Sequence, residues 1–136
     1  MNLIVVVDEK WGIGRNNGLL FQLKKDMKFF REKTTGKVVV MGANTFDSFP
    51  NGALPNRVNI VLDADGREHT GAVTVSTVQA LRKELEQYDT DEVFVIGGAS
   101  VYALLLNECA TAYVTKVQAD GQAELFFPNL NRTDCW

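Results

Sequence analysis

Short apolar runs alternate with amphipathic stretches along most of the chain. The apolar runs are rich in valine and isoleucine and are bounded by turn-forming residues, which is typical of buried strands. They cover residues 2–7, 37–41, 59–62, 72–75, 92–96 and 112–117, with a further short run at 124–127. Helices are predicted between them, over residues 24–33, 44–49, 77–88 and 99–106. This alternation predicts an α/β fold of three layers, a mostly parallel twisted sheet with helices on both faces.

Four segments that follow predicted strands are candidate ligand contacts. In an open sheet of this kind, ligands bind beyond the carboxyl ends of the strands. The first segment is part of residues 9–22, a long predicted loop rich in glycine and asparagine. The segments expected to line one cleft are residues 12–21, 42–45, 62–64 and 97–102.

Gly97 and Gly98 separate a buried strand from a helix and leave no room for an ordinary loop. A helix that starts so abruptly presents unpaired backbone N–H groups and the positive end of its dipole, and both suit a phosphate. Two adjacent glycines also let a ligand approach the backbone closely. A lone glycine pair more often marks a tight turn, so the phosphate interpretation depends on a second ligand contact nearby.

Composition narrows the classes of function. The 136 residues suit one domain over residues 1–136, and the net charge of −3 gives no sign of nucleic acid or a membrane as a partner. Cys109 and Cys135 lie far apart in no metal-ligand spacing, which fits a reducing cytosol. His69 is the only histidine and stands in a polar, turn-like stretch, so we expect it to be solvated and expect no metal site. No signal peptide or membrane span is visible, so we expect a cytoplasmic protein.

Asp26 is the candidate carboxylate. It lies on a predicted helix with Phe30 one turn later and Met27 beside it. A carboxylate among apolar groups binds a polar, protonatable heterocycle through paired hydrogen bonds, and desolvation raises its pKa. The alternative is an ordinary acid in the first turn of a helix, where it interacts favourably with the helix dipole. Position alone leaves both interpretations open.

The order and spacing of nine segments resemble the dihydrofolate reductase family across nearly the whole chain. The segments are IVV (4–6), WGIG (11–14), LLF (19–21), DMKFF (26–30), VMG (40–42) with Thr45, LPNR (54–57), NIVL (59–62), VIGG (95–98) with Val101 and Tyr102, and FP (127–128). Any one of them is a weak signal, but the ordered set is specific. The resemblance implies that family's fold and the NADPH-dependent reduction of 7,8-dihydrofolate to tetrahydrofolate, which supports one-carbon metabolism.

On the substrate side, the resemblance implies that Asp26 hydrogen-bonds the 2-amino group and a ring nitrogen of the pterin, which favours the protonated N5=C6 bond. Water, rather than Asp26 directly, is implied as the proton donor to N5, and Thr115 as a partner of the acid. Arg57 corresponds to the arginine that grips the α-carboxylate of the glutamate tail. The other implied substrate contacts are Ile4, Val5, Val6, Met27, Phe30, Phe49, Leu54 and Ile96.

On the cofactor side, the resemblance implies hydride transfer from nicotinamide C4 to pterin C6, so the two rings must stack. It also implies a cis peptide at Gly97–Gly98, and a mobile flap around residues 14–19 that closes over the nicotinamide. Tyr102 is implied near the nicotinamide, and a second helix start near the phosphates. The implied cofactor contacts are Val6, Ile13, Gly14, Leu19, Gly42, Ala43, Asn44, Thr45, Leu62, Asp63, Gly97, Gly98, Ala99, Ser100, Val101 and Tyr102.

Two departures from the family pattern concern the cofactor. Ala43 stands where a basic residue is usual, and Asp63 stands where a hydroxyl or basic residue is usual. Both places face the adenosine 2′-phosphate in the family. An acid there repels that phosphate and suits a ribose hydroxyl, so we expect a weakened preference for NADPH over NADH unless Arg67 or Lys37 compensates.

Two further departures concern the pocket wall and the end of the chain. Phe21 and Leu20 replace a usual tryptophan and proline, which we expect to tune the activity without abolishing it. The sequence stops at Trp136, where family members usually continue for two strands, so we expect the C-terminal hairpin to be missing. Its loss leaves a bare sheet edge, and we therefore expect a monomer, or a dimer paired through that edge.

Two other functions compete with this interpretation. A pyrimidine reductase of riboflavin synthesis shares the fold and cofactor, but it needs neither Asp26 beside Phe30 nor the turn at residues 54–57. An inactive pterin- or nucleotide-binding module is the second alternative, suggested by Ala43 and the short C-terminus. Comparing the turnover of dihydrofolate with that of a ribosylaminopyrimidine distinguishes a dihydrofolate reductase from the first alternative. Tight antifolate binding without NADPH oxidation would favour the second.

Overall fold

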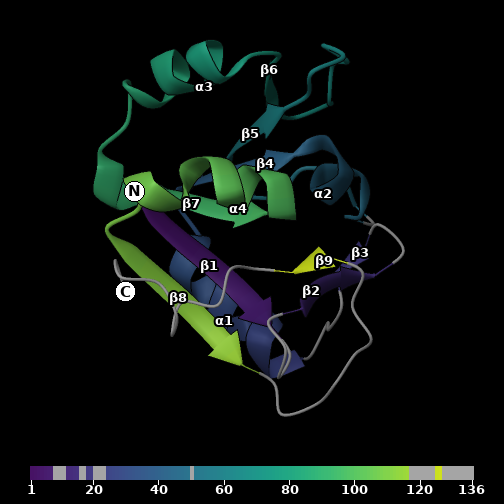
Figure 1. The fold of residues 1–136 in the computed structure, drawn as a ribbon, viewed down its shortest axis with the longest axis vertical. Helices are drawn as coiled ribbons and strands as arrows, with labels where there is room; N and C mark the ends of the chain where they lie inside the picture. The colour runs from purple at the N-terminus through teal and green to yellow at the C-terminus, as the bar shows by residue number, and fades with distance from the viewer. Residues whose placement is uncertain (8–11, 16–17, 20–23, 50, 117–124, 127–136) are drawn as a thin grey trace.

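Six parallel strands form the main sheet (Figure 1). The computed structural model describes residues 1–7, 12–15, 18–19, 24–49, 51–116 and 125–126. The strand order is β6-β5-β4-β7-β1-β8, and every neighbouring pair is parallel, which confirms the predicted sheet. The bounds are β1 (Asn2–Val7), β4 (Val38–Gly42), β5 (Val58–Leu62), β6 (Val73–Val75), β7 (Val93–Gly97) and β8 (Thr111–Lys116).

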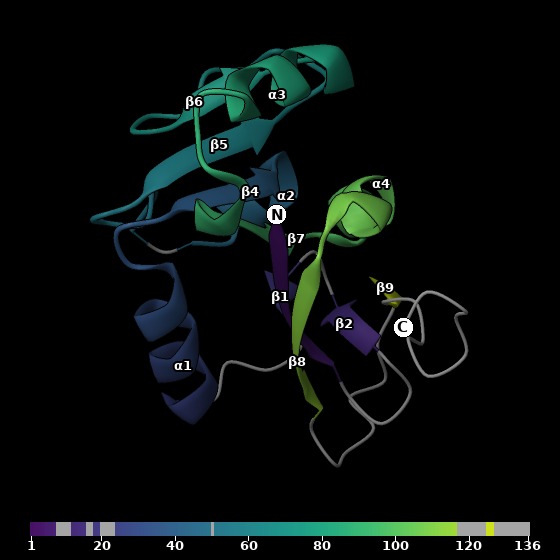
Figure 2. The same cartoon turned by 90° about the vertical axis from the view of Figure 1, so that its left-hand side faces the viewer.

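Helices cover both faces of the sheet. Figure 2 shows α1 and α4 on opposite sides of β1, as the three-layer prediction requires. No helix in the described part of the chain is both long and apolar enough to span a membrane. The helices are α1 (Lys24–Thr34), α2 (Ala43–Asp47), α3 (Val78–Leu85) and α4 (Ala99–Leu105), with short 3-10 turns η1 (Thr90–Glu92) and η2 (Leu106–Glu108).

The strands bury side chains on both faces, which explains their continuous apolar runs. In β1, Leu3 and Val5 join a cluster beneath α3 and α4, whereas Ile4 faces the other way. We call these the α4-side cluster and the α1-side cluster. The α4-side cluster contains Leu3, Val5, Val38, Val40, Ile60, Leu81, Val93, Val95, Val101, Tyr102, Leu105 and Cys109. The α1-side cluster contains Ile4, Val39, Met41, Phe46, Val61, Phe94 and Ile96.

The prediction of a loop over residues 9–22 is wrong in two places, where short strands occur. These are β2 (Gly12–Arg15) and β3 (Gly18–Leu19), which pair antiparallel. The run predicted at 124–127 forms β9 (Leu125–Phe126), which pairs with β2 outside the main sheet. Glycine-rich strands carry little apolar periodicity, so their pairing leaves no clear signal in the sequence.

Helix boundaries differ from the predictions by a few residues. The helix predicted over 44–49 begins at Ala43 and ends at Asp47. The helix predicted over 77–88 ends at Leu85, and Thr77 is its cap because its hydroxyl accepts a hydrogen bond from the Ala80 amide at 3.1 Å. Residue 117, predicted as the end of a strand, lies outside the described residues.

Replacing Leu81 by alanine is expected to lower the free energy of unfolding by about 2–5 kcal/mol, because this α3 side chain is fully buried and its removal leaves a cavity. Leu104→Ala on α4 is the matched control, since that leucine is 37% exposed and its loss should cost less than about 1 kcal/mol. Urea unfolding of both variants measures the difference. Equal losses would contradict the assignment of α3 to the core.

Candidate functional site

Two short helices begin side by side at the carboxyl edge of the sheet. α2 follows β4 directly and α4 follows β7, and these strands are neighbours. A Cβ atom on Gly42 would lie 3.3 Å from Val101 Cγ2, and one on Gly97 would lie 3.3 Å from Thr45 Oγ1. Gly97 also has φ +135°, a conformation that favours glycine. The two helix starts therefore meet only because no side chains stand between them.

The peptide between Gly97 and Gly98 is cis, which confirms the expectation drawn from the family resemblance. Gly42 and Gly98 occupy the N-cap positions of α2 and α4, and neither has a side-chain cap. The first-turn amides of both helices therefore have no capping oxygen within the described structure, and such amides suit phosphate oxygens. This glycine-lined edge fits the diphosphate of a dinucleotide.

Tyr102 ties α4 to the first strand. Its hydroxyl donates a hydrogen bond to the Ile4 carbonyl oxygen at 2.8 Å, and the side chain is buried. Burial raises the pKa of the Tyr102 hydroxyl, so this group stays protonated as a donor. The Ile4 carbonyl has a second lone pair, so it can still accept from another donor.

An apolar wall lies on the α1 side of the sheet. Phe30 of α1, Phe49 and Leu54 are partly buried and pack against the α1-side cluster, which includes Ile4 and Ile96. The structure thus brings together five of the residues predicted to contact the substrate. Val5 is different, because its side chain belongs to the α4-side cluster on the opposite face; its contact with the substrate stays a prediction. Alternation along β1 is the reason for the opposite face.

Backbone positions place four further predicted residues near this wall. Asp26 and Met27 lie in the first turn of α1, one turn before Phe30. Val6 of β1 is paired with Thr115 of β8. The side chains of these four residues lie outside the described part of the structure, as do those of Ile13 and Leu19 in β2 and β3 and all of Leu20 and Phe21. The movement of the flap stays a prediction.

Arg57 is held in a fixed orientation beside the wall. Its Nη1 donates to Thr34 Oγ1 at 3.0 Å, and its Nε donates to the Pro55 carbonyl at 3.0 Å. The guanidinium lies 5.9 Å from the centre of the Phe30 ring. Burial, and to a smaller extent the charge of Arg31, lowers the pKa of Arg57. A half-buried cation near a second arginine is an attractive site for a carboxylate.

Asn59 holds the turn that carries Arg57, and its role was missed in the sequence. The side chain is buried; its Nδ2 donates to the carbonyls of Leu54 at 3.0 Å and Arg57 at 3.2 Å, and its Oδ1 accepts from the Leu54 amide at 2.9 Å. Asn56 within this turn has φ +60°. The signal for this role in the sequence is a polar residue inside the valine- and isoleucine-rich strand β5, because a buried polar side chain must form hydrogen bonds.

The expectation of a solvated His69 is wrong. Its ring is buried, with Nε2 2.9 Å from Asp63 Oδ2. Asp63 is also buried and accepts from the Asp65 amide at 2.9 Å and from Arg67 Nε at 3.2 Å. The His69 hydrogen bond is the main cause that lowers the pKa of Asp63. The Asp63 carboxylate therefore bonds within its own loop and is not presented as an outward acceptor for a ribose hydroxyl.

Of the two basic residues named as able to compensate for Asp63, only Arg67 lies near it. Lys37 precedes β4 and pairs with Glu92 at 2.6 Å, at the amino edge of the sheet, so that part of the expectation is wrong. Arg67 lies beside Asp63, and its Nη2 is 3.8 Å from Asp47 at the end of α2. The Arg67 side chain is 58% exposed, so its charge reaches the surface at the carboxyl edge.

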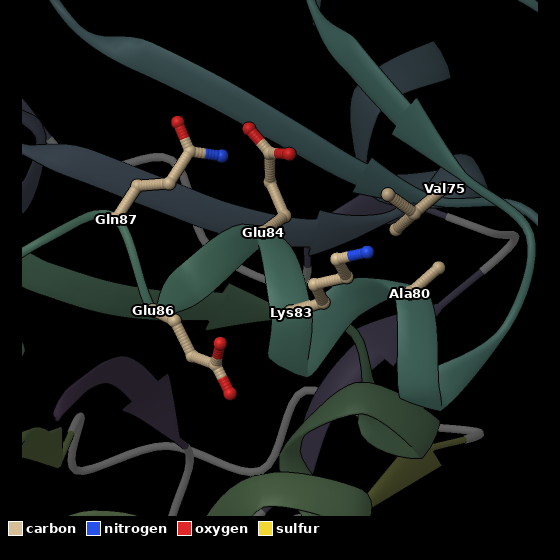
Figure 3. Close-up of a pocket in the computed structure, with 6 residues that line it drawn as sticks. All are labelled: Val75, Ala80, Lys83, Glu84, Glu86 and Gln87. Atoms are coloured by element: carbon tan, nitrogen blue, oxygen red, sulfur yellow. The ribbon is translucent and has the colours of Figure 1, made fainter.

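A surface hollow of about 520 Å³ lies beside α3, away from the features above (Figure 3). Its lining side chains carry mixed charges, and Figure 3 shows Glu86 directed away from Glu84 and Lys83. Because no set of polar groups converges there, this hollow is a poor candidate for chemistry. It is lined by Val75, Ala80, Lys83, Glu84, Glu86 and Gln87.

Comparison with known proteins agrees with this geometry. A family model described as dihydrofolate reductase matches residues 1–136. The dihydrofolate reductase of Haemophilus influenzae is 35% identical over 130 residues, which are 96% of this chain and 79% of the relative. The dihydrofolate reductase of Bacillus subtilis is 31% identical over 135 residues, 98% of this chain and 79% of that relative.

A solved structure is also similar. It is the dihydrofolate reductase of Enterococcus faecalis complexed with NADP(H) and RAB-propyl, with a TM-score of 0.85 and 31% identity over 96% of this chain and 77% of that chain. The fold, the glycine-lined edge and these comparisons lead to one conclusion. The chain belongs to the dihydrofolate reductase family.

Proposed function

We propose that this protein reduces 7,8-dihydrofolate to 5,6,7,8-tetrahydrofolate with NADPH. The observation that carries the proposal is the contact of two helix starts across Gly42 and Gly97, beside an apolar wall that ends at a fixed arginine. The first feature suits a dinucleotide diphosphate, and the second suits a flat heterocycle with a carboxylate tail. The family and the NADP(H) complex of the Enterococcus faecalis relative support the same activity.

The cofactor residues lie in two groups. Backbone amides of residues 97–101 and of residues 42–45 hold the diphosphate, and Tyr102 fixes the α4 side of the nicotinamide site through its bond to Ile4. NADPH supplies a hydride when bound. The glycines let the two helix starts approach each other, because a Cβ on Gly42 or Gly97 would crowd the opposite helix.

The substrate residues fall into groups that bind three different parts of the ligand. Asp26 binds the 2-amino group and a ring nitrogen of the pterin, with Thr115 as its partner, and this favours the protonated and more electrophilic N5=C6 bond. Water delivers the proton to N5. Phe30, Phe49 and Leu54 cover the flat rings, and Arg57 binds the α-carboxylate of the glutamate tail.

The fixed arginine also favours this activity over the pyrimidine reductase of riboflavin synthesis. Three hydrogen bonds from Asn59 and one to Thr34 set the orientation of the turn and of Arg57. Fixing a cation in this way costs conformational entropy, so we infer that a ligand carboxylate makes use of it. The riboflavin-pathway substrate carries no such glutamate tail.

We further propose that the protein has a single domain, is a monomer and is located in the cytoplasm. Cys109 supports the location, since it is buried and free, and burial raises the pKa of its thiol to about 11. Such a thiol is inert and needs no oxidising compartment.

Asp26→Asn is expected to lower kcat for dihydrofolate by about 10²–10⁴-fold, because the amide cannot favour the protonated pterin. The dissociation constant for NADPH should change by less than about twofold, since Asp26 is placed on the substrate side. Glu32→Gln, an exposed acid on the same helix, is the matched control. Absorbance at the NADPH band follows turnover, and an unchanged rate in Asp26→Asn would remove this residue from its role.

Arg57→Lys is expected to raise KM for dihydrofolate by about tenfold or more, because lysine loses the two-pronged contact with a carboxylate. The KM for 7,8-dihydropteroate, which lacks the glutamate tail, should stay nearly unchanged. Arg82→Lys on α3 serves as the control, since that arginine pairs only with exposed Glu108 among the described residues. Parallel rises for both substrates would contradict the assignment of Arg57 to the tail.

A further inference from the structure

A buried histidine–aspartate pair lies in the loop between β5 and β6. The side chains of His69 and Asp63 are about 5% and 4% exposed, and their Nε2 and Oδ2 atoms are 2.9 Å apart. A carboxylate only accepts hydrogen bonds, so Nε2 carries the proton that joins them. The His69 amide donates to Thr74 Oγ1 at 3.3 Å, and the His69 carbonyl accepts from the Ala72 amide at 3.0 Å. His69 is therefore fixed at both its ring and its backbone.

The other side of the His69 ring contacts α2. The ring lies edge-on to Phe46, with centroids 5.0 Å apart and an angle of 69°. Its Nδ1 lies 3.9 Å from Asp47 Oδ1, at the last residue of the helix. The same loop touches the segment after α2, because a Cβ on Gly71 would lie 2.9 Å from Ala53 Cβ. His69 thus joins the end of β5, through Asp63, to the side of α2.

α2 depends on its neighbours for its position. It has five residues, lacks a side-chain cap and buries one side chain, Phe46. A helix this short is not stable by itself in water, so packing determines where it lies. Phe46 lies between the sheet, where it belongs to the α1-side cluster, and the ring of His69. Without His69, Phe46 loses the nearer of its two ring contacts among the described residues and keeps only Phe49, at 6.3 Å between centroids, besides the sheet.

We propose that His69 is a positioning residue for the cofactor half of the active site. It holds α2 through Phe46 and Asp47, so that Thr45 stays beside Gly97 and Gly98 at the start of α4. This inference rests on the proposed function, because it assigns the edge between α2 and α4 to NADPH. The Arg57 end of the substrate half is held separately, by the bonds of Thr34 and Asn59 to this arginine and its turn.

His69→Ala is expected to raise the dissociation constant for NADPH by about tenfold, because displaced backbone amides no longer meet the diphosphate. The dissociation constant for folate should rise by less than about threefold. His69→Gln keeps a hydrogen-bond donor for Asp63 but loses the ring. Its NADPH affinity should therefore lie between that of His69→Ala and that of the wild type. Thr70→Ala, an exposed neutral neighbour in the same loop, is the matched control. Fluorescence titration of each ligand on the purified chain measures both constants without turnover.

The possible outcomes distinguish a failure of this inference from a failure of the proposed function. NADPH affinity within twofold of wild type in both His69 variants would overturn this inference alone. Parallel losses of NADPH and folate affinity would also overturn it, because they indicate a general loss of structure. If His69→Ala does not fold, His69→Gln decides, with circular dichroism as the check of folding. A wild-type chain that binds neither ligand and does not reduce dihydrofolate would instead overturn the proposed function.

Discussion

The close approach of two short helices at one edge of the sheet creates the place to which we assign the cofactor. α2 and α4 each begin at the end of a strand, and β4 and β7 are neighbours, so the first turns face each other. Side chains at Gly42 or Gly97 would fill the gap between them. Two helix starts without side-chain caps then present amides to the same space, and this arrangement suits a diphosphate better than one helix start alone. The pairing of β4 with β7 keeps these two elements next to each other.

Most of the fold follows from local patterns in the chain. Continuous apolar runs such as 93–96 predict strands buried on both faces, and intervening amphipathic stretches predict the two helical layers. The prediction failed for β2 and β3, because paired glycine-rich strands have no apolar alternation to detect. Helix ends were displaced by a few residues, as with α2, whose start at Gly42 has no side-chain cap to mark it in the sequence.

The candidate site was less predictable than the fold. Family resemblance supplied the roles of Asp26 and Arg57, and the residues alone left Asp26 open. His69 was expected in solvent because the residues around it are polar and turn-forming. In the structure, its buried ring shares a hydrogen bond with Asp63 of the same loop and packs on Phe46 of α2. Such a pair has no sequence signature, since each partner alone is typical of a surface loop.

The two halves of the site are held by different kinds of interaction. At the substrate end, side chains bond to nearby backbone: Asn59 to the turn at 54–57, and Thr34 to Phe30 of its own helix. At the cofactor end, α2 depends on packing between the sheet and the β5–β6 loop. A substitution in the loop can therefore change the cofactor edge without disturbing the arginine.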